Sequence, residues 1–154
     1  MGLVYSQLKW LANKMKVIAP IKAVLQVGRL DIFIEKEELE NLLIKLQVGG
    51  YCNGDKFCLF DKHSNDLYYS ILNSNLAYND KFSNPRFTKK RLISDKLFFG
   101  AFGVEKVDSV DIDSSRDGST YSHDLNMQGL LMSVGGAKYD LVIDGGLMEH
   151  VFDV

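Results

Sequence analysis

Three aspartates that each close a short, partly apolar run are the residues best placed for chemistry: Asp111, Asp124 and Asp144. A fourth such run closes at Gly28. Ligands of a parallel α/β sheet bind beyond the carboxyl ends of its strands. There, one carboxylate can accept hydrogen bonds from a ribose diol and another can meet an amino group. Converging carboxylates would repel one another without a cationic or donor-rich ligand. The alternative is that each aspartate only begins a turn or caps a helix.

The strands that must carry these residues are short. The predicted strands cover 23–28, with the turn beginning at Gly28, and 106–111, 120–124 and 139–144. Helices and loops separate them, which is typical of a parallel sheet. The expected fold class is therefore α/β, a Rossmann-like parallel sheet with flanking helices.

Helical periodicity and end signals predict helices over 4–18, 35–46 and 95–99. The second has the strongest pattern, because acids crowd its first turn and leucines line one face. Gly49 and Gly50 are expected to stop it. Ser94 is the expected N-cap of the third helix.

An aromatic-rich insertion is expected at about 50–92 within a single domain spanning 1–154. Asn53 and Gly54 form a favoured two-residue turn and predict a hairpin over 51–60. The rest of the insertion is predicted to be rich in loops. Cys52 and Cys58 lack the spacing of a zinc knuckle. We expect them to be structural or surface thiols, and we expect no metal site.

Composition narrows the protein class. The 154 residues are 46% hydrophobic and 25% charged, with a net charge of −2. These values fit one globular domain and exclude collagen-like, coiled-coil and disordered chains. The charge gives no reason to expect nucleic acid. No apolar run approaches the roughly 18 residues of a spanning helix, and no signal-peptide core is visible. The expectation is a cytoplasmic protein that binds neither nucleic acid nor membrane.

Four segments together carry a resemblance to a known family. They are VLQVGR from Val24, VDSVD from Val107, HDLN from His123 and YDLVIDGGLMEHVF from Tyr139. The chain resembles the class I S-adenosylmethionine-dependent methyltransferases, and is most similar to a bacterial methyltransferase-like group with a DLVIDGGxxEHVF signature. The resemblance covers residues 92–154 well and 20–46 moderately. It implies a methyltransferase-type sheet and S-adenosylmethionine as cofactor.

The resemblance also implies roles for individual residues. Gly28 would let the backbone approach the methionine part of the cofactor, and Asp111 would hold the ribose hydroxyls. The other implied cofactor-binding residues are Ile112 beside Asp111, Asp124 and Leu125 at the adenine, and Asp144 and Gly145 at the methionine moiety.

Two residues of the signature are the implied catalytic pair. Glu149 and His150 begin the next helix and could face the substrate. His150 could act as a base, since an unperturbed histidine has a pKa near 6.5. A purely structural hydrogen bond is the alternative role for His150. Alignment of the nucleophile with an already activated methyl group could supply most of the rate.

The sequence departs from the family in two ways. Its motif has one glycine, and Arg29 and Leu30 are expected to put bulk in the cofactor cradle. The family sheet has seven strands, whereas this chain supplies four and reaches Val154 just after the fourth. We therefore expect an incomplete domain, either the N-terminal part of a longer protein or a truncated product. Its fourth strand would be an exposed apolar edge that promotes self-association.

These patterns favour methyl transfer from S-adenosylmethionine to an unknown acceptor, and the resemblance implies a small molecule or saccharide. One alternative is a nonenzymatic relic or interaction module that kept the fold and lost the cofactor site. Another is a different nucleotide-binding α/β protein, such as a nicotinamide-dependent enzyme. The single glycine argues more strongly against this last alternative, because dinucleotide binding needs a phosphate cradle.

Overall fold

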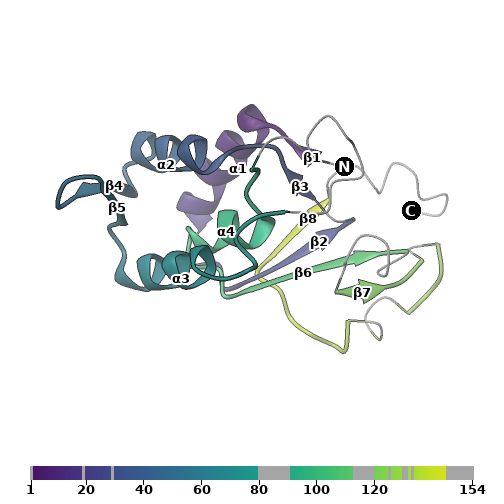
Figure 1. The fold of residues 1–154 in the computed structure, drawn as a ribbon. Helices are drawn as coiled ribbons and strands as arrows, with labels where there is room; N and C mark the ends of the chain where they lie inside the picture. The colour runs from purple at the N-terminus through teal and green to yellow at the C-terminus, as the bar shows by residue number, and fades with distance from the viewer. Residues whose placement is uncertain are drawn as a thin grey trace.

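Four parallel strands form the central sheet of the computed structural model (Figure 1). They are β2 (Ala23–Val27), β6 (Lys106–Asp111), β7 (Tyr121–Ser122) and β8 (Leu141–Asp144). The structure describes residues 2–18, 20–28, 30–79, 91–112, 120–124, 126–129, 132 and 134–144. The strands lie in the order β7-β6-β2-β8. In chain order this is third-second-first-fourth, the same order as the first four strands of a doubly wound Rossmann-like sheet. The predicted α/β class with a parallel sheet is confirmed.

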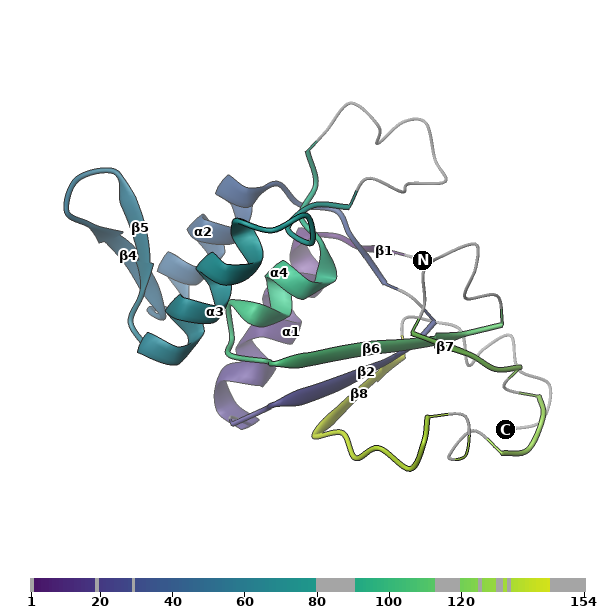
Figure 2. The same ribbon diagram turned by 60° about the horizontal axis from the view of Figure 1, so that its bottom comes forward.

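Four helices lie on one side of this sheet and share one apolar core with it. They are α1 (Tyr5–Ile18), α2 (Lys36–Lys45), α3 (Lys62–Leu72) and α4 (Asp95–Gly100). Figure 2 shows α2, α3 and α4 on the same side of the strands. Residues paired across a parallel sheet share a face, and Val24 pairs with both Val107 and Leu141. These three side chains join the core that the helices form.

The opposite face of the sheet has a smaller apolar cluster. Leu25, Val27 and Val110 are buried there, with Tyr121 and Tyr139 packed against them. Among the described residues, no helix covers this face. Two tyrosine rings from the polypeptide around β7 and β8 partly fill the place that helices usually take over a parallel sheet.

The three predicted helices are confirmed, but one end signal is wrong. Helix α2 begins with a reciprocal capping box between Glu35 and Glu38, and Ser94 caps α4 by accepting from the Leu97 N–H at 3.0 Å. The predicted stop for α2 at Gly49 and Gly50 is not observed. The helix ends earlier, where Gln47 adopts a positive φ of 57°, and the two glycines begin a strand.

The predicted hairpin is also confirmed. Strands β4 (Gly49–Cys52) and β5 (Lys56–Leu59) are antiparallel. The predicted two-residue turn is one residue too short, because Cys52 pairs with Lys56 and leaves Asn53, Gly54 and Asp55 in the loop. Asn53 and Gly54 both have positive φ, of 47° and 87°. Cys52 and Cys58 form a disulfide across this hairpin, which corrects the expectation of thiols. The hairpin brings together two residues whose sequence spacing alone suggested no pairing.

Three other elements were not predicted. Helix α3 lies in the segment expected to be loops, because its asparagine, serines and tyrosines are weak helix formers. The Asp61 cap and burial of Tyr68 stabilise it. Strands β1 (Gly2–Leu3) and β3 (Asp31–Ile32) form a short parallel pair. Two residues per strand are too few to give a recognisable pattern.

Two predicted strands are shorter in the structure, since side chains at their ends bond to the backbone. Asp140 accepts hydrogen bonds from the N–H groups of Lys22 and Ala23 at 2.7 and 2.9 Å, so it lies before β8. Asp124 lies in a turn after β7. Within the described part of the chain, no helix is long and apolar enough to cross a membrane.

Candidate functional site

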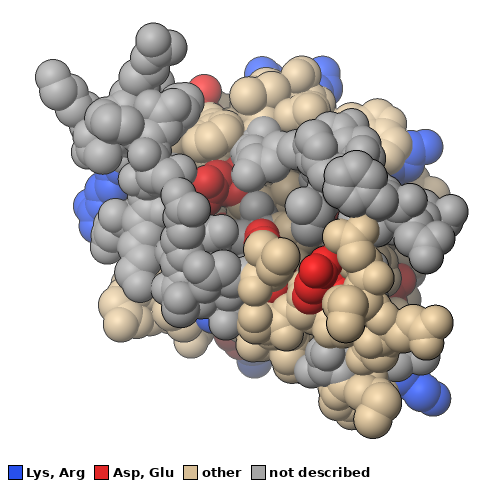
Figure 3. Space-filling model, turned by 90° about the vertical axis from the view of Figure 1, so that its right-hand side faces the viewer, with Lys and Arg blue, Asp and Glu red and all other residues tan. Residues whose placement is uncertain are grey.

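The carboxyl ends of the four strands meet at one edge of the sheet. The Gly28 N–H donates to the Val110 carbonyl at 2.8 Å, and the His123 N–H donates to the Asp111 carbonyl at 2.8 Å. On the other side of β2, Asp144 pairs with Val27. The edge therefore brings together the ends of segments far apart in the sequence. Figure 3 shows acidic side chains in the middle of this side of the molecule, with lysine and arginine at its margins.

Gly28 occupies a conformation that favours glycine. It follows β2 directly and has a φ of 73°, a left-handed value that other residues adopt only with strain. The sheet order reverses at β2, which has later strands on both sides. Ligands of open α/β sheets bind at this kind of switch point. Gly28 is thus at the expected place for a backbone that approaches a ligand.

A buried glutamine holds the turn that contains Gly28. Gln26 is 0% exposed. Its amide nitrogen donates to Asp95 Oδ2 at 2.7 Å, and its Oε1 accepts from the Leu30 N–H at 2.9 Å. The side chain thereby ties the polypeptide after β2 to the first turn of α4. The sequence signal was a lone amide inside an apolar run, and sequence reasoning missed it.

The expected obstruction by Leu30 is not observed. Its side chain is only 2% exposed, so its bulk lies in the interior and not at the open edge. Arg29 lies outside the described residues. The next described helix, α2, begins only at Lys36, after the short strand β3. The turn therefore lacks the strand-to-helix junction that cradles a pyrophosphate in dinucleotide sites.

Asp111 lies next to Gly28 at this edge, since Val110 pairs with Val27 one residue earlier. Its Oδ1 accepts from the Ile112 N–H at 2.7 Å. That bond orients the half-buried carboxylate at the end of β6. Ile112 itself is exposed, so it offers an apolar surface beside the carboxylate.

Asp124 belongs to the same end of the sheet but has a local role. Its Oδ1 accepts from the Asn126 N–H at 2.9 Å and from the Asn126 side-chain amide at 3.0 Å. These hydrogen bonds lower the pKa of Asp124 below its ordinary value, so the carboxylate is ionised at neutral pH. The turn role that was the alternative for these aspartates is present at Asp124. Leu125 lies outside the described residues.

Asp144 lines a pocket of about 380 Å³ between β8 and the N-terminal half of α1. Ser6, Gln7 and Trp10 contribute from α1, and Trp10 is 64% exposed. The remaining lining residues are Leu3, Leu11 and Ile143. Sequence reasoning missed this contribution from α1. Gly145, Glu149 and His150, also predicted as site residues, lie outside the described residues.

A polar cluster on the helix-free face steadies the strands that end at this edge. Asp108 Oδ2 accepts from the Tyr139 hydroxyl at 2.7 Å and lies 3.0 Å from Lys106 Nζ. Tyr121 reaches the same oxygen at 3.4 Å. Burial alone would raise the pKa of Asp108, but the hydrogen bond from Tyr139 and the Lys106 ammonium hold it below its ordinary value. Burial and hydrogen bonds with Tyr121 and Asp108 raise the pKa of Tyr139.

Taken together, the described groups suit an uncharged or cationic polar ligand more than a phosphate. Carboxylates end β6 and β8 on either side of Gly28, and a carboxylate accepts hydrogen bonds but repels an anion. In the described part of the chain, no group of three histidine, cysteine or acidic residues could hold a metal ion. No family model matches the sequence, and neither a curated protein nor a solved structure matches the chain.

Proposed function

We propose that this protein is an S-adenosylmethionine-dependent methyltransferase whose cofactor lies across the carboxyl edge of the sheet. The observation that carries the proposal is the switch point at β2, where Gly28 has a positive φ between strands that end in Asp111 and Asp144. A ribose diol suits a carboxylate acceptor, and a methionine ammonium suits a second carboxylate. S-adenosylmethionine supplies an electrophilic methyl group when it is bound.

The residues at the carboxyl edge would each bind a different part of the cofactor. Asp111 would accept from the ribose hydroxyls, and Ile112 would cover the cofactor beside it. Asp124 and Leu125 would border the adenine. Gly28 would let the backbone approach the methionine part, which Asp144 and Gly145 would border from the other side.

The pocket between α1 and β8 is the proposed acceptor site. It adjoins Asp144, the residue proposed to lie at the methionine moiety. Trp10 offers an exposed ring face, while Ser6 and Gln7 offer hydrogen-bonding groups. This mixture of ring and polar groups fits a small hydroxylated molecule such as a saccharide. Glu149 and His150 remain the proposed pair facing the acceptor, with His150 as a candidate base.

Calorimetric titration with S-adenosylhomocysteine tests the cofactor site. We expect micromolar binding and none with NADH, because the turn lacks a pyrophosphate cradle. Asp111→Asn should weaken binding at least tenfold, since a hydrogen bond to a charged group contributes about 1.5–3 kcal/mol. Asp66→Asn, an exposed change on α3, is the matched control and should leave binding unchanged. Equal weakening by both variants would contradict the assignment of Asp111.

A second candidate function is an interaction module that kept this fold without a cofactor. The specific observation in its favour is the run Gly28-Arg29-Leu30 with its single glycine, in a turn not directly followed by a helix. This candidate predicts a cooperatively folded protein that binds neither S-adenosylhomocysteine nor NADH. The third alternative, another nucleotide-binding protein, predicts binding of NADH instead.

A further inference from the structure

Helix α1 buries one side in the core and exposes the other. Its buried residues are Leu8, Leu11, Ala12 and Met15. The exposed residues of the opposite side are Ser6, Trp10, Asn13 and Val17. Positions three, four and seven apart lie on the same side of a helix, so these four residues form one continuous stripe. Val17 is 84% exposed and Trp10 is 64% exposed. Two large apolar side chains therefore stand in solvent about two helical turns apart.

Two lysines flank this stripe, one on each side. Lys9 comes just before Trp10 and Lys14 just after Asn13, and each step along a helix is a rotation of about 100°. The two lysines therefore fall on opposite flanks of the stripe, and both are exposed. The Lys14 Nζ lies 5.8 Å from the centroid of the Trp10 ring. The outer face of α1 thus combines an apolar stripe with a cation on either side.

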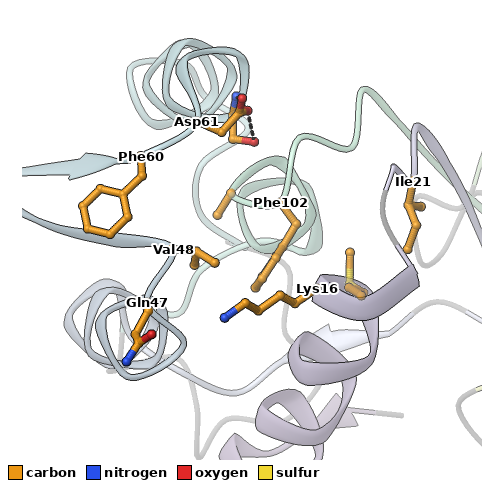
Figure 4. A pocket seen from close by; sticks show the side chains of 10 residues that line it. Lys16, Ile21, Gln47, Val48, Phe60, Asp61 and Phe102 are labelled. Atoms are coloured by element: carbon orange, nitrogen blue, oxygen red, sulfur yellow. Dashed lines mark hydrogen bonds between the residues drawn. The ribbon is translucent and has the colours of Figure 1, made fainter.

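The third lysine of α1 faces away from the stripe. Figure 4 shows the Lys16 side chain extending from the helix toward Gln47, at a pocket on the inner side of α1. Its Nζ donates to the Leu46 carbonyl at 2.6 Å. That bond satisfies a carbonyl at the C-terminal end of α2. Lys16 therefore has a structural role and does not belong to the outer face.

Acidic residues are missing from this part of the sequence. The basic residues among the first 30 are Lys9, Lys14, Lys16, Lys22 and Arg29, and this stretch has no aspartate or glutamate. The whole chain nevertheless has a net charge of −2. Its net charge therefore conceals a basic N-terminal segment, and the outer face of α1 is complementary to an anionic surface.

The exposed apolar surface continues from α1 onto β8. A groove of about 350 Å³ separates the two elements. Its exposed apolar lining residues are Trp10, Ile18 and Val142. Ile18 is 55% exposed and Val142 is 57% exposed. The acid that lines the groove, Asp144, belongs to β8 and not to the helix. The outer face of α1 is therefore part of a wider apolar patch.

We propose that the outer face of α1 docks on the surface of an anionic lipid bilayer. Trp10 and Val17 would enter the boundary between head groups and acyl chains, where tryptophan is enriched. Lys9 and Lys14 would lie at the level of the phosphates, with their apolar stems beside the stripe. A nucleic-acid backbone would pair with the lysines but would leave Val17 without an apolar partner. Docking in this way revises the expectation of no membrane contact.

Docking also has a consequence for the pocket beside Asp144. Trp10 lines that pocket as well as the groove. A docked protein would therefore hold the mouth of the pocket at the lipid surface. The docking face itself consists of side chains on α1 and does not depend on the proposed methyl transfer.

The fluorescence of Trp10 measures docking directly, because the chain has a single tryptophan. The protein is held below micromolar concentration and titrated with vesicles of phosphatidylserine and phosphatidylcholine. We expect a saturable blue shift of the emission, and quenching by vesicles with brominated acyl chains. Vesicles of phosphatidylcholine alone should bind at least tenfold more weakly. Raising the salt from about 0.1 M to about 1 M should weaken binding, because the Debye length falls from about 10 Å to about 3 Å.

Three exposed substitutions test the assigned residues. Lys9→Gln and Lys14→Gln should each weaken binding about fivefold. Val17→Asn should also weaken it, because it removes an apolar side chain from the interface. All three positions are exposed, so the variants should fold as the unmodified protein does, and each keeps Trp10 as the probe. Lys62→Gln, an exposed change on α3, is the matched control and should bind as the unmodified protein does.

Absence of a saturable blue shift with the anionic vesicles would overturn the proposal. Equal binding to both kinds of vesicle would also overturn it, because the flanking lysines would then recognise no anionic surface. So would equal weakening by Lys62→Gln and Lys9→Gln. A blue shift without vesicles that disappears on dilution would assign the stripe to a second copy of the chain instead. A shift with a DNA oligonucleotide and none with vesicles would assign it to nucleic acid. None of these results depends on whether S-adenosylhomocysteine binds.

Discussion

Replacement of Gln26 by leucine removes both bonds that tie the Gly28 turn to α4. Leucine has nearly the same size but can neither donate to Asp95 nor accept from the Leu30 N–H. Leaving a buried N–H unsatisfied costs about 1–3 kcal/mol, and the lost bond to a carboxylate contributes about 1.5–3 kcal/mol. Asp95 is half-buried and regains some hydration, and leucine gains apolar burial. We therefore expect a net loss of about 2–4 kcal/mol in the free energy of unfolding.

Urea unfolding followed by circular dichroism measures this loss. The corresponding decrease in Tm is about 4–16 °C for a chain of this size. Gln7→Leu is the matched control, because Gln7 is exposed and makes one hydrogen bond, to the Val4 N–H; it should cost less than about 1 kcal/mol. Faster hydrogen exchange at Leu30 would locate the change. A loss below about 1 kcal/mol for Gln26→Leu would refute the claim that this side chain holds the turn.

Three further predictions concern other parts of the structure. The folded-state pKa of Asp108 is lowered, so its contribution to stability is present above the unfolded-state value of about 3.9 and is lost as pH falls through the folded-state value. Asp108→Asn should therefore be less stable than the unmodified protein at pH 7, and urea titrations should show this gap closing at acidic pH; a gap independent of pH would contradict it. Reduction of the Cys52–Cys58 disulfide by dithiothreitol should lower the free energy of unfolding by up to about 2 kcal/mol, as chain entropy predicts for so short a loop, and an unchanged Tm would count against this. Val142 is 57% exposed on β8, which has no neighbouring strand on its outer side among the described residues. We expect self-association at micromolar concentration and a monomer after Val142→Lys, both measured by sedimentation velocity; a monomeric unmodified protein would rule out association through this edge.

Local patterns in the sequence were enough to predict several elements. Helix α2 combines acids in its first turn with leucines at helical spacing, and both effects act within a few residues. The Asn53–Gly54 turn predicts its hairpin because few other residues tolerate positive φ at both positions. Strand β2 was recognisable from a short apolar run, and β6 from an alternating pattern that ends in an acid. Where one local effect dominates, sequence and structure agree.

The failures occur where a local signal competes with packing. Gly49 and Gly50 resemble a helix stop, yet α2 ends earlier and the pair enters β4, where the ring of Phe57 packs close to Gly49. Helix α3 has weak intrinsic propensity and exists because Tyr68 is buried, with its hydroxyl 3.3 Å from Glu40. Burial of that kind involves residues from another helix and leaves no local pattern.

The candidate site also combines features that the sequence predicts with features that depend on packing. The residue types at strand ends, Gly28 with Asp111 and Asp144, were visible in the sequence, and so was the parallel sheet that aligns them. The order of the strands was not, since it depends on pairing between residues that lie more than 80 positions apart in the sequence, such as Val27 and Val110. Two other features could not be predicted from the sequence. One is the pair of hydrogen bonds that Gln26 makes to Asp95 and Leu30, and the other is the contribution of α1 to the pocket beside Asp144. Contacts of this kind depend on the burial and hydrogen bonding of the whole folded chain, so only the tertiary structure shows them.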